Sequence, residues 1–210
     1  MIEAVIKAVL LDLGNVIVGL DFDRAYRAAA AHSPFSAAEI PGLIRAAALS
    51  DPYERGEMSN EEFYRRFCAA LQMDGVSFAE FRGLWGDMFE PTPLLPERML
   101  EGLSARHRLI LVSNTNDLHF RRIQQQYPLL GHFHECVLSY RVGAMKPAVE
   151  IYQEAIRLAG CAATECFFTD DIAANVEGAR RLGIDAVLFR GERDFKSHLA
   201  RRGVTWEDSA

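Results

Sequence analysis

The stretch VLLDLGNVIVGLDF, residues 9–22, decides the fold, because an apolar, β-branched run ends in it on Asp12 and breaks into Leu13, Gly14 and Asn15. Residues 5–11 are apolar at nearly every position, which is typical of a strand covered on both faces of a parallel sheet. A buried strand that ends on a carboxylate and a glycine indicates that this end faces a polar site rather than the core.

Four later segments repeat the pattern of the first strand, and each is separated from the next by helix-like sequence. Strands that alternate with helices predict an α/β fold with an open parallel sheet, right-handed crossovers and helices on both faces. The segments are residues 109–112, 166–169 and 186–189, with a weaker one at 135–138.

Residues 21–93 are expected to be helical only, so we predict a Rossmann-like core of residues 1–18 and 93–210, interrupted by a helical insert of residues 19–92. Three Ser-x-x-Glu capping boxes predict helix starts, and aromatic residues spaced by four are expected to pack in a core. Three prolines indicate a linker at residues 89–96. The capping serines are Ser36, Ser59 and Ser77, and the aromatic residues include Phe63, Phe67, Phe81 and Trp85.

Composition excludes several classes of partner. The 210 residues carry a formal net charge of −6, and their lysines and arginines are scattered, so a nucleic-acid surface is not expected. Charged residues in the N-terminal apolar segment argue against a membrane span. Four cysteines without metal-ligand spacing, and no secretory leader, predict reduced thiols and a cytoplasmic protein. The sequence predicts no oligomeric state.

Polar side chains follow the predicted strands where ligands bind in open parallel sheets, beyond the carboxyl ends. Three carboxylates in one crevice would repel one another unless a cation were present, and hard oxygen ligands favour Mg²⁺. A lysine and neighbouring hydroxyl and amide groups would then polarise a phosphoryl group. The carboxylates are Asp12, Asp170 and Asp171, and the other groups are Ser113, Asn114 and Lys146.

Each of these residues also has a purely structural interpretation. Asp12 could serve a turn, Ser113 or Asn114 could cap the following helix, and Asp170 and Asp171 could serve the N-terminus of another. Their joint occurrence, in order, at the ends of successive strands favours the functional interpretation.

Four motifs in order, LLDLGNV, LILVSNTN, GAMKPAVEIY and FFTDDIAAN, resemble those of the haloacid dehalogenase-like hydrolase superfamily over almost the whole chain. The insert is similar to the small cap of its first class, which closes over the crevice and selects the substrate. The motifs look closest to those of the bacterial α-D-glucose-1-phosphate phosphatases. The resemblance implies a phosphatase for a small phosphorylated metabolite, such as a hexose 1-phosphate.

The resemblance also implies roles for these residues. Asp12 would be the nucleophile that forms an aspartyl-phosphate. Ser113 and the backbone around Asn114 would bind phosphoryl oxygens, and Lys146 would pair with that group and with Asp12.

Magnesium would be held by Asp12, by the backbone carbonyl of Gly14 and by Asp171, with Asp170 as a ligand or a neighbour of one.

Gly14 departs from the pattern, because most phosphatases of the superfamily that this chain resembles carry an acid–base aspartate there. Its absence typically costs roughly 10²–10⁴-fold in rate. A substitute acid could come from Asp21, Asp23 or His119, although the aspartates more simply start a helix and the histidine more simply lies in solvent. An acidic leaving alcohol, such as an anomeric hydroxyl, would need less help.

Three rival functions stay open at this stage. A dehalogenase would need no metal, and we expect it to lack the Asp170–Asp171 pair and to carry an aromatic residue at position 14. A phosphomutase would depend on the missing acid–base. A binding protein would tolerate loss of Asp12. Residues of the insert that could face the crevice are Tyr53, Glu54, Arg55, Tyr64 and Trp85.

Overall fold

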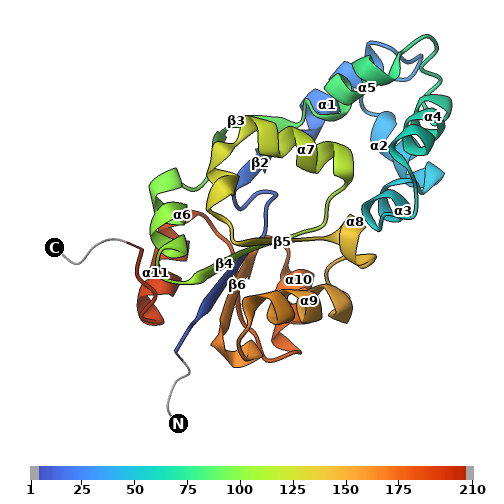
Figure 1. Ribbon diagram of the computed structural model, residues 1–210. Helices are drawn as coiled ribbons and strands as arrows, with labels where there is room; N and C mark the ends of the chain where they lie inside the picture. The colour runs from blue at the N-terminus through green and yellow to red at the C-terminus, as the bar shows by residue number, and fades with distance from the viewer. Residues whose placement is uncertain (1–4, 207–210) are drawn as a thin grey trace.

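A five-stranded parallel sheet forms the centre of the computed structural model, which describes residues 5–206 (Figure 1). The strand order β5-β4-β1-β6-β7 places the first strand in the middle, where both its neighbours are parallel to it. This confirms the α/β fold predicted from the sequence. The strands are β1 (Ala8–Leu11), β4 (Arg108–Ser113), β5 (Glu135–Leu138), β6 (Cys166–Asp170) and β7 (Asp185–Leu188).

Helices cover both faces of this sheet, so consecutive strand residues enter different cores. Val9 and Leu11 pack in a core with α6, α7 and α11, whereas Ala8 and Leu10 pack in a second core with α9 and α10. All four side chains are fully buried, which explains why the strand is apolar at every position. The helices are α6 (Glu97–Ser104), α7 (Asp117–Gln126), α8 (Ser139–Val142), α9 (Val149–Ala159), α10 (Ala173–Arg180) and α11 (Glu192–Arg201), with 3₁₀ turns at Pro128–His132 and Ala163–Glu165.

Five helices between β1 and β4 form an insert with its own aromatic core, on one side of the sheet in Figure 1. Ser59 and Ser77 cap α4 and α5 as predicted. The prediction for Ser36 was wrong: Glu39 accepts hydrogen bonds from Ser36, but the helix begins only at Ile40. The helices are α1 (Phe22–Ala30), α2 (Ile40–Ala47), α3 (Ser50–Glu54), α4 (Asn60–Ala70) and α5 (Phe78–Trp85).

A two-stranded antiparallel ribbon joins the insert to the sheet. It pairs β2 (Val18–Leu20) with β3 (Phe89–Pro93), so part of the predicted linker is a strand. Its prolines fit because this ribbon has only edge strands. The domain boundaries at residues 18/19 and 92/93 stay a prediction, and residues 1–4 and 207–210 of the predicted core lie outside the described residues.

The insert contacts the core where α3 lies beside α8. Gly56 has φ +72°, and a Cβ there would collide with the carbonyl oxygen of Tyr140. Nearby, Asn60 Nδ2 donates a hydrogen bond of 2.8 Å to Asp117 Oδ2, and Tyr53 Oη donates to Asn60 Oδ1 at 2.7 Å. Backbone packing and a polar pair therefore hold α3 against the core.

We expect Gly56→Ala to lower the melting temperature, because the new methyl group separates α3 from α8. The left-handed conformation alone costs an alanine roughly 1 kcal/mol. Gly75→Ala is the matched control, since Gly75 has φ +76° with no atom within 4 Å of the added Cβ. Thermal unfolding of both variants separates the effect of the collision from that of the backbone strain, and equal losses of melting temperature would contradict the contact.

Among residues 5–206, no helix is long and apolar enough to cross a bilayer.

Candidate active site

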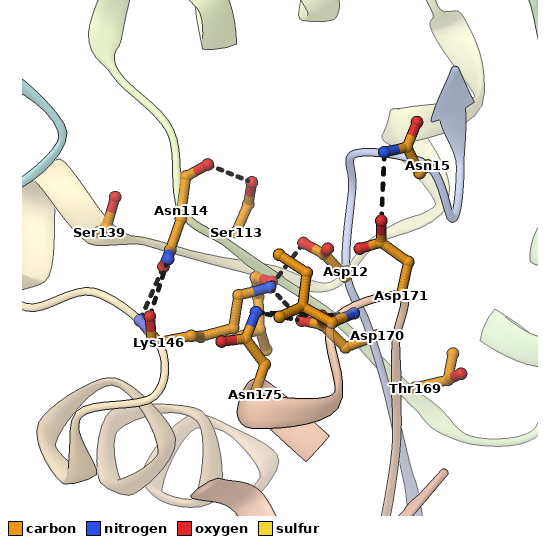
Figure 2. A network of polar contacts seen from close by, with 12 residues as sticks. Asp12, Asn15, Ser113, Asn114, Ser139, Lys146, Thr169, Asp170, Asp171 and Asn175 are labelled. Atoms are coloured by element: carbon orange, nitrogen blue, oxygen red, sulfur yellow. Dashed lines mark hydrogen bonds and ion pairs between the residues drawn. The ribbon is translucent and has the colours of Figure 1, made fainter. Parts of the chain in front are cut away.

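Polar groups converge at the carboxyl edge of the sheet, as Figure 2 shows. Asp12 follows β1 directly, Ser113 ends β4 and Asp170 ends β6. The pairing of β1 with β4 and β6 in register brings these ends side by side. Lys146 reaches the same place from the loop between α8 and α9. The structure thus brings together residues that are up to 158 positions apart in the chain, from Asp12 to Asp170.

The Lys146 ammonium lies at the centre of the site. Its Nζ donates to Asp12 Oδ1 at 2.6 Å, to Asp170 Oδ2 at 2.6 Å and to the Val112 carbonyl oxygen at 2.8 Å. The side chain is 1% exposed. Burial lowers the pKa of Lys146, but the two carboxylates outweigh this effect, so its pKa is raised and the ammonium stays charged.

Asp170 is fully buried and has partners on both oxygens. Its Oδ1 accepts from the Ile172 amide at 2.8 Å, and Asn175 Nδ2 lies 3.0 and 3.1 Å from the two oxygens. Asn175 lies in the first turn of α10, and Tyr152 Oη fixes this turn by donating to the Asn175 carbonyl oxygen at 2.7 Å. Sequence reasoning missed Asn175; its place one helical turn after the acidic pair was the available signal.

Asp171 is less enclosed than Asp170 and has one hydrogen-bond partner among the described residues, Asn15 Nδ2, which donates to Oδ2 at 3.1 Å. Asn15 has φ 53°, a left-handed conformation that asparagine tolerates. Its Oδ1 accepts from the Leu20 amide at 3.3 Å, so Asn15 ties the loop after β1 to the acidic pair. Sequence reasoning did not assign this residue a role.

The three carboxylates fit a divalent cation. One oxygen from each of Asp12, Asp170 and Asp171 lies within 4.8 Å of the others, and hard cations such as Mg²⁺ prefer carboxylate oxygens. Burial raises the pKa of Asp12, while Lys146 lowers it. A second positive charge would favour the ionised form of this cluster.

Asn114 shapes the site through its side chain. Its Oδ1 accepts from the Lys146 amide at 2.7 Å, and its Nδ2 donates to the Lys146 carbonyl oxygen at 3.0 Å. The Asn114 carbonyl oxygen accepts from Ser113 Oγ at 3.4 Å, so its backbone N–H, rather than its side-chain amide, is available for a ligand. Neither Ser113 nor Asn114 caps α7, because Asn116 does so by accepting from the His119 amide. The capping interpretation of Ser113 and Asn114 is therefore wrong.

A cavity of about 250 Å³ extends from this edge of the sheet into the insert. Gly14, Ser113 and Asn114 line its core end, and Glu54 lines it from α3. Most of the remaining wall is apolar, with Phe22, Ile40, Phe67, Met73 and Trp85 among its residues.

The three candidates for a substitute acid lie elsewhere or are occupied. Asp21 caps α1 by accepting from the Arg24 amide at 2.9 Å, and neither Asp21 nor Asp23 lines the cavity. His119 does line it, but it is buried and stacked on Trp85, not solvated as expected. Its Nδ1 and Nε2 contact Asn116 and the Trp85 carbonyl oxygen, and burial lowers its pKa to about 4.

Fold and site together define an α/β enzyme whose acidic groups and lysine meet at the carboxyl edge of a parallel sheet. Residues 6–183 match the family model of the haloacid dehalogenase-like hydrolases. The chain belongs to this family of hydrolases, which confirms the resemblance at the level of the superfamily.

Two curated relatives are phosphatases. The D-ribitol-5-phosphate phosphatase of Bacteroides thetaiotaomicron is 26% identical over 92% of this chain and 97% of its own. A phosphatase of Mycobacterium tuberculosis is 28% identical over 87% of each chain. A solved structure of a family enzyme of B. thetaiotaomicron, in complex with magnesium and inorganic phosphate, superposes with a TM-score of 0.82 at 26% identity, covering 92% of this chain and 98% of that one.

Proposed function

We propose that this protein is a magnesium-dependent phosphatase that hydrolyses a small phosphomonoester through an aspartyl-phosphate on Asp12. One observation carries the proposal: the Lys146 ammonium lies between Asp12 and Asp170, close to a third carboxylate, and the neighbouring residues Gly14, Ser113 and Asn114 line a cavity. This set offers a nucleophile, a fixed positive charge and a cation site together. The curated phosphatases and the structure with magnesium and phosphate support it.

In the proposed reaction, Asp12 Oδ2 attacks phosphorus, because Oδ1 is held by Lys146. The Lys146 ammonium orients this carboxylate and attracts a phosphoryl oxygen, while Ser113 Oγ and the Asn114 backbone amide donate to the others. Asp170 holds Lys146 in place, and Asn175 holds Asp170 by donating to its carboxylate. Water then attacks the aspartyl-phosphate and releases phosphate.

For the cation we propose Asp12, the Gly14 carbonyl and Asp171 as direct ligands. Both oxygens of Asp170 already have hydrogen-bond partners, whereas Asp171 contacts only Asn15 Nδ2 among the described residues. When bound there, Mg²⁺ supplies positive charge that offsets the repulsion between an anionic nucleophile and an anionic phosphate. The intact acidic pair also favours a phosphatase over a dehalogenase.

The substrate we propose is a phosphorylated metabolite whose alcohol enters the cavity. A sugar or polyol phosphate, including a hexose 1-phosphate, is supported by the sequence resemblance and by the relative named for D-ribitol 5-phosphate. The apolar wall of the cavity favours a second candidate, an ester with an apolar alcohol, since such a wall leaves sugar hydroxyls unpaired. A cytoplasmic location is supported by four cysteines without a disulfide.

Phosphate release is expected to require Mg²⁺. The test is a panel of hexose 1-phosphates, polyol phosphates and aryl phosphates, assayed with Mg²⁺ and with EDTA. We expect release from some members with Mg²⁺ and none above background with EDTA. A folded protein that is silent on the whole panel, or equally active in EDTA, would contradict the proposal.

A second readout reports the cation itself. Mg²⁺ at about 100 times its Kd stabilises the folded state by about 2.7 kcal/mol, and we expect a corresponding rise in melting temperature. Asp171→Asn should reduce this rise, whereas Asp74→Asn, outside the acidic cluster, should not.

A further inference from the structure

Glu54 lines the cavity that begins at Gly14 and Ser113. It contributes the only carboxyl group among the residues that line this cavity, and the other lining groups that titrate are Tyr26 and His119. His119 has both ring nitrogens engaged, and burial raises the pKa of the Tyr26 phenol. Glu54 is therefore the one lining group suited to exchange a proton near neutral pH.

The helix that carries Glu54 is held against the core. Glu54 is the last residue of α3, which lies beside α8 in Figure 1, and the contact of Gly56 with Tyr140 follows two residues later. Tyr53 is tied to Asn60, which is in turn tied to α7. The Glu54 carboxyl group itself has no hydrogen-bond or ion-pair partner among the described residues, so it is available to a ligand.

The surroundings of Glu54 favour a carboxyl group that holds its proton near neutral pH. Burial raises the pKa of Glu54 to about 7, the Asp51 carboxylate on the same helix adds to the effect, and the Lys146 ammonium on the core opposes it. A phosphate dianion in the site would act in the same direction as Asp51, because it adds negative charge nearby.

We propose that Glu54 is the general acid–base of this enzyme and takes the role that an aspartate at position 14 would have. The inference rests on the proposed function. As Asp12 Oδ2 bonds to phosphorus, the bond from phosphorus to the ester oxygen breaks, and Glu54 gives its proton to that oxygen. The Glu54 carboxylate then accepts a proton from the water that attacks the aspartyl-phosphate, which restores Asp12, the Glu54 acid and free phosphate.

Two aryl esters of similar shape and different leaving ability test the proposal. Phenolate is a much poorer leaving group than p-nitrophenolate, so only phenyl phosphate needs the proton. In Glu54→Gln, we expect kcat/KM for phenyl phosphate to fall by about 10²-fold and kcat/KM for p-nitrophenyl phosphate to change by less than about threefold, because kcat/KM reports the steps up to loss of the alcohol and not the later attack of water. Glu57→Gln is the matched control, because Glu57 lies in the same segment, is exposed and carries a carboxylate that pairs with Arg55.

The outcomes separate this inference from the proposed function. If wild-type protein releases phosphate from neither aryl ester nor from any other member of the panel, the phosphatase proposal fails. If it releases phosphate from both, but Glu54→Gln lowers kcat/KM equally for both esters or for neither, the phosphatase stands and the role of Glu54 is overturned.

The pH profile gives a test with Glu54 itself intact. Plotted against pH, kcat/KM of the wild type for phenyl phosphate should show a limb that descends above about pH 7, because Glu54 loses its proton there. The profile for p-nitrophenyl phosphate should show no such limb. Asp51→Asn removes a neighbouring negative charge, so the limb should move to lower pH. A limb that is common to both esters, or that does not move, would assign the titration to another group and overturn the proposal.

Discussion

Asp12→Asn is expected to abolish phosphate release, with a loss of kcat on the order of 10⁴-fold or more. The amide nitrogen or oxygen of asparagine is a poor nucleophile, so no aspartyl-phosphate forms. The fold should survive, because the amide oxygen still accepts the hydrogen bond of Lys146, which is 2.6 Å long in the native site. The measurement is phosphate release from p-nitrophenyl phosphate with saturating Mg²⁺, beside circular dichroism of the variant.

Asp23→Asn is the matched control, since this carboxylate is exposed on α1 and does not line the cavity. We expect its rate to stay within about twofold of wild type. Wild-type protein quenched in acid during turnover should also carry one added phosphoryl group by intact mass, and Asp12→Asn should not. Retained activity in Asp12→Asn would place the nucleophile elsewhere.

The sheet was predictable because each strand is buried on both faces. Continuous apolar runs such as that ending at Leu11 have one simple solution, a parallel strand between two layers of helices. The ribbon at Phe89–Pro93 was missed because Pro91 and Pro93 normally argue against a strand. Proline disrupts a strand only where a neighbouring strand would accept a hydrogen bond from the missing backbone N–H. The strand β3 pairs with a neighbour on one side.

The convergence of Asp12, Ser113 and Asp170 was predictable from topology, since the carboxyl ends of parallel strands share one edge. The residues that orient these side chains were not predictable from topology. Asn15 and Asn175 act through side-chain geometry, and asparagine after a strand or early in a helix is common for many reasons.

In the insert, too, the sequence alone did not single out the residue that the structure favours. Glu54 was one of several residues that could face the crevice, and its sequence neighbours do not distinguish it from Arg55. The pKa of Glu54 depends first on burial, then on Asp51 and on the distant Lys146, and neither the burial nor the place of Lys146 can be read from the sequence.

Lys146→Met is expected to destabilise the protein by about 3–5 kcal/mol and to abolish activity, because it leaves two buried carboxylates without their counter-charge. All three hydrogens of the native ammonium have acceptors, and Asp12 and Asp170 are 7% and 0% exposed. Urea unfolding at pH 8 in EDTA measures the loss.

Lys196→Met is the control, since Lys196 makes an ion pair of the same 2.6 Å length with Glu192, but at the surface, where it contributes less than about 1 kcal/mol. Equal losses in the two variants would contradict the buried site. Mg²⁺ should restore part of the stability of Lys146→Met, because a cation also neutralises the carboxylates, but it should not restore turnover. Stability responds to the total charge in the crevice, whereas turnover needs an ammonium that holds Asp12 and the phosphoryl group at once.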